Sequence, residues 1–193
     1  MSTTSRTLRT AVLGTALVIA SSVAGAGPAA ATAANCPVVY WGSLAKTSAL
    51  NPILATVDNV RTGRHTCYDR IVFDVGGRAP LGYTVGYAEP SFRLDGSDAP
   101  VDLIGGADLQ ITINAPAHDL KYVPTFDPAD PTHAVDVTGY RTLRQVYWGG
   151  TYEGYTTVGL GVRARLPYRV FQLDGPGGHS RFVIDVAHQW TSF

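Results

Sequence analysis

Short segments in which apolar and polar residues alternate are the clearest pattern in this chain. In residues 70–75, Ile71, Phe73 and Val75 share one face, and in residues 181–186 the same face is formed by Phe182, Ile184 and Val186. An alternation with period 2 is typical of a strand with one side in a core. Similar alternation covers residues 83–87, 109–113 and 157–162. We therefore predict strands at all five places.

Glycine and proline interrupt the chain between these segments at short intervals. Residues 115–133 hold four prolines and no periodic pattern, which predicts a long loop. After the first 34 residues we find no apolar stripe with helical period over three or more turns. Short strands separated by turn residues indicate an all-β sandwich or barrel in a single domain.

The segments at residues 70–75 and 181–186 also repeat each other in residue type. Both read Arg, apolar, Val, apolar, Asp, Val, and both follow a short stretch with Gly and His. We interpret the repeat as pseudo-symmetry, in which each of two related sheets uses one copy. The alternative is chance, since Val, Ile and Phe are the residues that strands favour. Residues i and i+4 of a strand lie about 13 Å apart, so each Arg is expected to pair with an Asp across strands.

The N-terminus has the features of a secretory signal peptide over residues 1–34. Arg6 and Arg9 precede an apolar stretch at residues 11–20, and small residues follow up to a cleavage site near Ala34 or Asn35. The apolar stretch is too short to span a bilayer, which needs about 20 residues. We expect a secreted, extracellular protein that holds no membrane segment after cleavage and that associates with the cell wall.

Two cysteines, Cys36 and Cys67, remain after that cleavage. In an exported protein an even number of cysteines favours a disulfide, which would tie the N-terminal segment, residues 35–66, to the domain that follows. The alternative, a cysteine nucleophile or metal pair, lacks supporting residues at suitable spacing. Loss of Arg6 and Arg9 would leave 13 basic and 15 acidic residues, a net charge of −2. This balance argues against nucleic acid as a partner.

Catalytic and metal-binding motifs are weak. There is no G-x-S-x-G motif, and the five histidines show no ligand spacing. Asp95, Asp98 and Asp102 offer oxygen ligands without the spacing of a calcium loop, so a turn is the simpler interpretation. We therefore expect no metal, no cofactor and no catalytic residue. A small hydrolase remains the alternative, and it would use loop residues such as Asp119 or Asp130 with His118 or His133.

Aromatic residues between glycines provide the candidate binding surface. They are Tyr147, Trp148, Tyr152 and Tyr155. Aromatic rings stack on the apolar faces of sugars and leave polar edges for hydroxyls. Any one of these rings, Tyr147 or Trp148 above all, is equally well explained as part of the core. We expect a second aromatic pair, Tyr40 and Trp41, to plug one end of the core.

The order of several motifs resembles the AMIN-like domain of exported actinobacterial proteins. The matching segments are CYDRIVFDVGG (67–77), GYTVGYAE (82–89), the DGS turn (95–97), YEGYTTVGLGVRARLPYRVFQLDGPG (152–177) and SRFVIDV (180–186). The related AMIN domains are β-sandwiches of two similar sheets that localise exported amidases and secretins by binding peptidoglycan. The resemblance therefore implies a non-catalytic sandwich of two similar antiparallel sheets at residues 67–188, followed by a short tail at 189–193. It places no binding residue on this chain.

We thus expect an exported, non-catalytic module that binds peptidoglycan or another component of the cell envelope. Its partner would be a cell-wall glycan or an envelope protein. Besides the small hydrolase, the other alternative is an extracellular protein-interaction or inhibitor domain.

Overall fold

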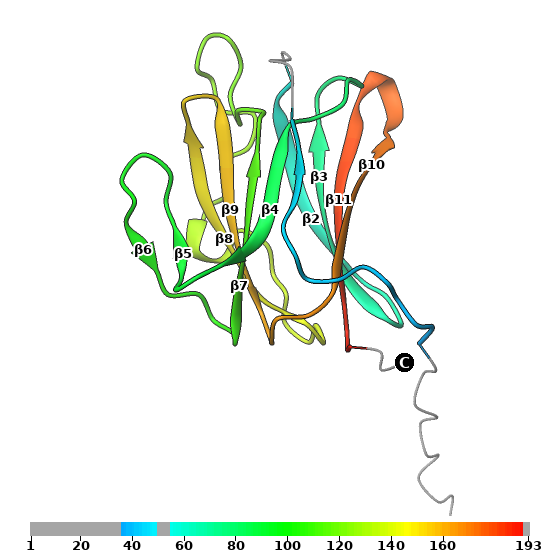
Figure 1. The fold of residues 1–193 in the computed structure, drawn as a ribbon. Coiled ribbons are helices and arrows are strands. Elements are labelled where there is room, and N and C mark those ends of the chain that lie inside the picture. The colour runs from blue at the N-terminus through cyan, green and yellow to red at the C-terminus, as the bar shows by residue number, and fades with distance from the viewer. Residues whose placement is uncertain (1–35, 50–54, 191–193) are drawn as a thin grey trace, which may run out of the picture. The chain divides into compact units, whose positions relative to one another are not determined.

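The computed structural model describes residues 36–49 and 55–190, which form a sandwich of two antiparallel sheets (Figure 1). Sheet A has the strand order β1 (Lys46–Ser48), β4 (Tyr83–Ala88), β7 (Ala107–Ile113), β9 (Tyr155–Val162) and β8 (Leu143–Tyr152). Sheet B has the order β10 (Tyr168–Asp174), β11 (Ser180–Ala187), β3 (Tyr68–Val75) and β2 (Val57–Arg64). A small hairpin consists of β5 (Phe92–Arg93) and β6 (Pro100–Val101), and two short 3-10 helices span Pro131–His133 and Pro176–Gly178. The predicted all-β fold of two antiparallel sheets is confirmed.

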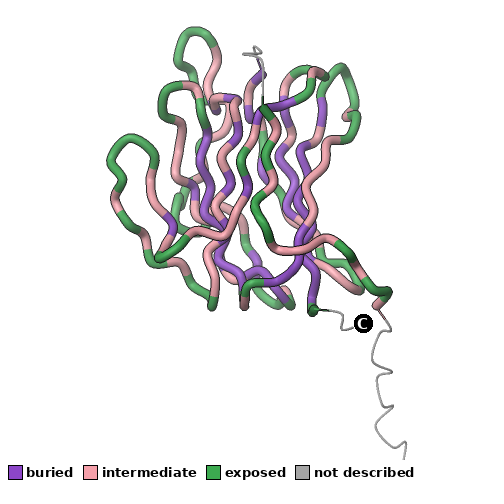
Figure 2. The backbone as a smooth tube through the Cα atoms, viewed as in Figure 1, coloured by how far each residue is buried: buried purple, intermediate pink, exposed green. Residues whose placement is uncertain are grey.

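The core lies between the two sheets and uses the predicted faces of the strands (Figure 2). Ile71, Phe73 and Val75 of β3 are fully buried, as are Leu109, Ile111 and Ile113 of β7. Each fully buried side chain of this size stabilises the fold by about 1.5–3 kcal/mol relative to exposure. The alternating pattern is therefore sufficient to assign the inward faces of β3 and β7.

The sandwich begins before the expected residue 67. Strand β2 is an edge strand of sheet B, and β1 is an edge strand of sheet A. Val57 and Val60 of β2 point into the core, although the polar residues between them obscure the pattern in the sequence. The proposed signal peptide, residues 1–34, lies outside the described residues. Within the described part of the chain, no helix is long and apolar enough to cross a membrane.

The two similar segments lie side by side in sheet B, so the hypothesis of one copy in each sheet is wrong. Strands β3 and β11 are its two central strands and pair antiparallel, with Ile71 opposite Ile184, Val72 opposite Val183 and Phe73 opposite Phe182. The same register sets Arg70 against Asp185 and Asp74 against Arg181. The repeat is thus self-complementary, because reversing one copy places like apolar residues and opposite charges across from each other.

The β5–β6 hairpin covers the outer face of sheet A. Phe92 is completely buried there, and a Cβ atom added at Gly159 would lie 2.8 Å from Phe92 Cδ1 and 2.9 Å from Leu103 Cδ1. The small residues on the second face of β9 therefore let the hairpin approach the sheet closely. Sheet A is thus covered on both faces near β8 and β9.

Candidate functional site

The outer face of sheet B carries three rows of side chains, each running across all four strands. The register gives the rows as Arg169–Asp185–Arg70–Gly63, Phe171–Val183–Val72–Arg61 and Leu173–Arg181–Asp74–Asn59. Four arginines and two aspartates give these rows a net charge of +2, whereas the chain as a whole has 15 basic and 15 acidic residues. This face therefore concentrates positive charge on a rigid sheet.

Asp185 joins two of these arginines. Its side chain is completely buried, and its carboxylate lies 2.6 Å from Nε of Arg70 and 2.7 Å from Nη2 of Arg169. Hydrogen bonding to Asp185 raises the pKa of Arg70. One carboxylate between two guanidinium groups leaves a surplus of one positive charge. Such charge-assisted hydrogen bonds stabilise the arginine side chains and also fix their orientation.

Aromatic rings flank both guanidinium groups. The guanidinium carbon of Arg169 lies 4.5 Å from the ring centre of Trp41 and 5.0 Å from that of Phe171. Arg70 lies 5.3 Å from the ring of Tyr68, and the rings of Trp41 and Tyr68 meet edge to face at 5.9 Å. Cation–π contacts at such distances contribute about 0.5–1 kcal/mol each when exposed. The arginines and rings thus hold one another in place.

An open cavity of about 530 Å³ lies at the end of this face where strand β3 begins. Its lining includes Trp41, Tyr68, His65, Thr66, Arg169 and Gln189, together with both cysteines. The ring of His65 stacks on that of Tyr68 with centres 4.4 Å apart. A cavity of this volume is in the range that small ligands occupy. We define this cavity, with Trp41, Tyr68 and Arg169, as the arginine–aromatic site.

The predicted disulfide forms one wall of the cavity. Cys36 and Cys67 are bonded, with Cα atoms 5.3 Å apart, and this link holds the N-terminal segment with Trp41 against sheet B. The prediction that Tyr40 and Trp41 plug the core is wrong, because Trp41 lies over Arg169 on the outer face and Tyr40 is exposed.

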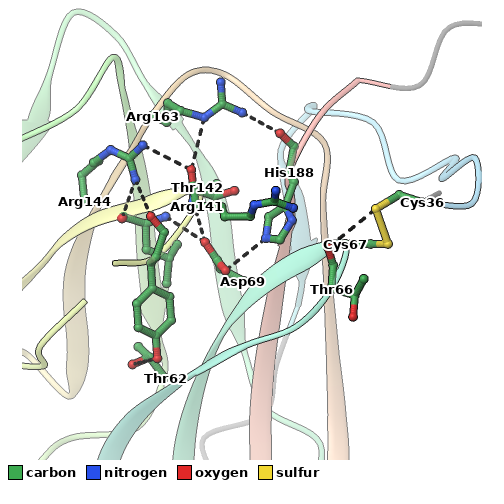
Figure 3. A network of polar contacts seen from close by, with 12 residues as sticks. Cys36, Thr62, Thr66, Cys67, Asp69, Arg141, Thr142, Arg144, Arg163 and His188 are labelled. Atoms are coloured by element: carbon green, nitrogen blue, oxygen red, sulfur yellow. Dashed lines mark hydrogen bonds and ion pairs between the residues drawn. A yellow bond between two sulfur atoms is a disulfide. The ribbon is translucent and has the colours of Figure 1, made fainter. Parts of the chain in front are cut away.

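A buried polar network supports the strand ends next to the cavity (Figure 3). Asp69 Oδ2 accepts hydrogen bonds from the backbone N–H groups of Thr142 at 2.5 Å and Leu143 at 3.3 Å. Nε2 of His188 lies 3.1 Å from Oδ1 of the same carboxylate. The backbone N–H of His188 donates to the carbonyl oxygen of Cys67. The network therefore fixes the start of β3, from which Tyr68 and Arg70 project.

A second charge pair lies across the face. Arg61 donates from Nε and Nη2 to the two oxygens of Asp74, both at 2.9 Å. These bonds lower the pKa of Asp74 and keep its carboxylate charged. The pair is partly exposed, so it contributes at most about 1 kcal/mol. It neutralises charge locally and leaves the surplus positive charge near Arg70, Arg169 and Arg181.

The aromatic residues predicted to bind a ligand do not form one surface. Trp148 is only 8% exposed and packs its ring against Phe126 in the core. Tyr147 points to the other face of sheet A, where its ring contacts Phe92. Tyr152 and Tyr155 are exposed and lie opposite each other at the β8–β9 turn. Burial removes Trp148 from the candidate surface, and the two exposed tyrosines remain a separate candidate.

The loop residues of the hydrolase alternative act in local turns. Asp119 Oδ1 accepts from the backbone N–H groups of Lys121 and Val123. Asp130 accepts from Thr132, which lowers the pKa of the carboxylate, and His133 lies 3.3 Å from it with more than half of its side chain exposed. The lowered pKa makes the exposed carboxylate of Asp130 a poor general acid or base at neutral pH, and the carboxylate of Asp119 is occupied by two backbone N–H groups.

The carboxylates of Asp95 and Asp98, in the turn after β5, interact with different partners. Asp95 accepts a hydrogen bond from the hydroxyl of Thr157, and Asp98 pairs with Arg93 at 3.1 Å. The two side chains thus serve different partners, which agrees with the interpretation as a turn.

Sequence reasoning missed Trp41, Tyr68 and Arg169. The sequence holds one signal for Arg169. The tight turn at Gly175–Gly178 sets the pairing of β10 with β11, and alternation along residues 168–171 then puts Arg169 and Phe171 on the same face as Asp185. No comparable signal exists for Trp41, because its place depends on a contact across 128 residues.

Comparison with known proteins identifies the family. The model of the AMIN-like domain matches residues 55–188, which include every strand except β1. No curated protein and no solved structure shows a significant match.

Proposed function

Because the chain belongs to the AMIN-like domain family, we propose that it is an exported, non-catalytic module that binds peptidoglycan or another glycan of the cell envelope. The observation that carries the proposal is the arginine–aromatic site on the outer face of sheet B. Partly exposed aromatic rings beside polar groups suit the stacking and hydrogen bonding that hold sugar rings. The site lies on rigid strands and is held by a disulfide and ion pairs, as a preorganised binding site requires.

The geometry favours binding over catalysis. In the arginine–aromatic site the buried carboxylate of Asp185 is engaged by two arginines, so it serves structure and not proton transfer. Asp119 and Asp130, from the hydrolase alternative, hold local turns. We therefore propose an envelope glycan as the partner, with an envelope protein as the alternative.

The proposal is tested by sedimentation of the purified, signal-free protein with insoluble peptidoglycan sacculi. Wild-type protein is expected in the pellet, and Trp41→Ala is expected mainly in the supernatant because it removes one wall of the site. Tyr152→Ala tests the separate aromatic pair and is expected to sediment like wild type, provided that circular dichroism shows all three to be folded.

Each other outcome of this assay contradicts part of the proposal. A wild-type protein that stays in the supernatant would argue against glycan binding and for a protein partner. Loss of sedimentation in Tyr152→Ala alone would move the site to the β8–β9 turn. Release of soluble wall fragments during the incubation would favour the hydrolase.

A further inference from the structure

The arginine–aromatic site has a surplus of positive charge. A neutral sugar would bind without interacting with this charge. Arg70 and Arg169 share the single carboxylate of Asp185, which is completely buried. Arg61 is already matched by Asp74, and Arg181 donates to the backbone carbonyl oxygen of Asp174. The positive charge beside the cavity is therefore not neutralised by the carboxylates of this face.

Arg169 connects this surplus charge to the cavity. It lines the cavity, and its side chain is 41% exposed. Nε and Nη2 of Arg169 are engaged by Asp185, while Nη1 has no hydrogen-bond partner among residues 36–49 and 55–190. An arginine that is held from one edge by a carboxylate and on its faces by rings is preorganised to offer its remaining N–H groups to an anion.

The other walls of the cavity suit a sugar ring. Trp41 provides an aromatic face, and Thr66, His65 and Gln189 provide polar groups. The cavity volume of about 530 Å³ is in the range of small-molecule sites. The arrangement thus combines a platform for the apolar face of a pyranose with a cation for an acidic substituent.

From this arrangement we infer that the cavity recognises an acidic sugar, a pyranose that carries a carboxylate or a phosphate, with the anionic oxygens on Arg169. The inference rests on the proposed function and specifies its ligand chemistry. Carboxylate and phosphate share the geometry that a guanidinium binds. The two sources are the carboxylate of muramic acid in peptidoglycan strands that have lost their stem peptides, which otherwise hold this carboxyl group as an amide, and the phosphate of an anionic wall polymer.

The test compares three sugars that differ in one substituent: N-acetylglucosamine, N-acetylmuramic acid and N-acetylglucosamine 1-phosphate. The affinity of the wild-type protein for each is measured by NMR titration at low salt and again at higher salt. At least one acidic sugar is expected to bind about tenfold or more tightly than the neutral sugar, because a hydrogen-bonded charge pair is worth about that factor or more. Added salt is expected to reduce this preference.

Variants identify the residue responsible. Arg169→Gln is expected to abolish the preference for the acidic sugar, and Arg169→Lys to keep part of it as a point charge without the fork of donors. Arg93→Gln is the matched control, because it removes the same charge from a side chain that is also 41% exposed but lies on β5. If Arg169→Gln fails to fold, Trp41→Ala provides the second test and is expected to weaken binding of each acidic sugar that the wild-type protein binds.

The outcomes separate this inference from the proposed function. Three results would overturn the inference: equal affinity for the three sugars, no binding of either acidic sugar, or an unchanged preference in Arg169→Gln. Sedimentation with sacculi would still support the proposed function in each of these cases. Binding of an acidic sugar by a protein that does not sediment with sacculi would support the inference and contradict the proposed function. A stronger response to N-acetylmuramic acid indicates peptidoglycan strands without stem peptides, and a stronger response to the phosphate indicates an anionic polymer.

Discussion

Two buried aspartates at the same end of sheet B have different roles. Asp185 is completely buried on the outer face and orients two arginines of the candidate site. Asp69 lies inside the strand ends and receives two backbone N–H groups and His188. A buried carboxylate is tolerated only when it is paired and hydrogen-bonded, and both residues meet this condition.

Removal of the Asp69 carboxylate is expected to destabilise the fold strongly. Asp69→Ala leaves the N–H groups of Thr142 and Leu143 without their acceptor, and each unsatisfied buried group costs about 1–3 kcal/mol. We expect the free energy of unfolding to fall by about 3 kcal/mol in urea denaturation. Asp69→Asn keeps one acceptor oxygen and is expected to lose less.

The control for this prediction is Asp136→Ala. Asp136 is exposed and accepts a hydrogen bond from the backbone N–H of Thr138, so its loss is expected to cost less than about 1 kcal/mol. Equal destabilisation by Asp69→Ala and Asp136→Ala would show that the buried network is unimportant for stability.

The alternation of side chains along a strand gives its two faces different roles. The inward residues of β3 and β11 fill the core, and their outward residues build the rows of the candidate site. In β9 the inward residues are apolar and the outward ones are small, because the β5–β6 hairpin lies on that face. The size and polarity of the outward side chains of these strands therefore depend on what covers the outer face of the sheet.

An added methyl group at Gly159 is expected to disturb the hairpin. In Gly159→Ala the new Cβ would lie 2.8 Å from the ring of Phe92, so Phe92 or the sheet must shift. Overpacking of this kind costs about 1–3 kcal/mol, which thermal unfolding would record as a lower Tm.

Gly63→Ala is the matched control on β2. Its nearest heavy atom is Nε2 of His65 at 3.6 Å, an ordinary contact, and alanine is favoured over glycine within a strand by about 0.5–1 kcal/mol. We expect an unchanged or slightly higher Tm. An equal fall in Tm for both variants would contradict the packing account.

Local pattern was sufficient to predict the fold class, the inward faces of β3, β7 and β11, and the disulfide, because each depends on nearby residues or on compartment. Pairing between distant strands was not predictable in this way, so the two similar segments were assigned to separate sheets. The sequence around Trp148, with Tyr147 before it and Gly149 after it, left both a binding ring and a core ring open, and the alternation along β8 places it in the core. The candidate site combines Trp41, Tyr68 and Arg169, whose proximity arises only in the folded chain.

The N-terminal segment of the protein completes the candidate site. The disulfide between Cys36 and Cys67 and the stacking of Trp41 on Arg169 place that segment over the end of sheet B. Sheet A, in contrast, has its outer face near β8 and β9 covered by the hairpin. Of these two faces, the outer face of sheet B therefore offers the charged and aromatic surface for a ligand.

The outer face of sheet B is the proposed binding surface for the envelope ligand. The most direct test is an NMR titration of the ¹⁵N-labelled protein with solubilised peptidoglycan fragments, mapped onto the backbone amides. We predict that the largest shifts cluster at Trp41, Tyr68 and Arg169, with little change at Tyr152 and Tyr155. Shifts that cluster at the β8–β9 turn, or no shifts at all, would contradict the account.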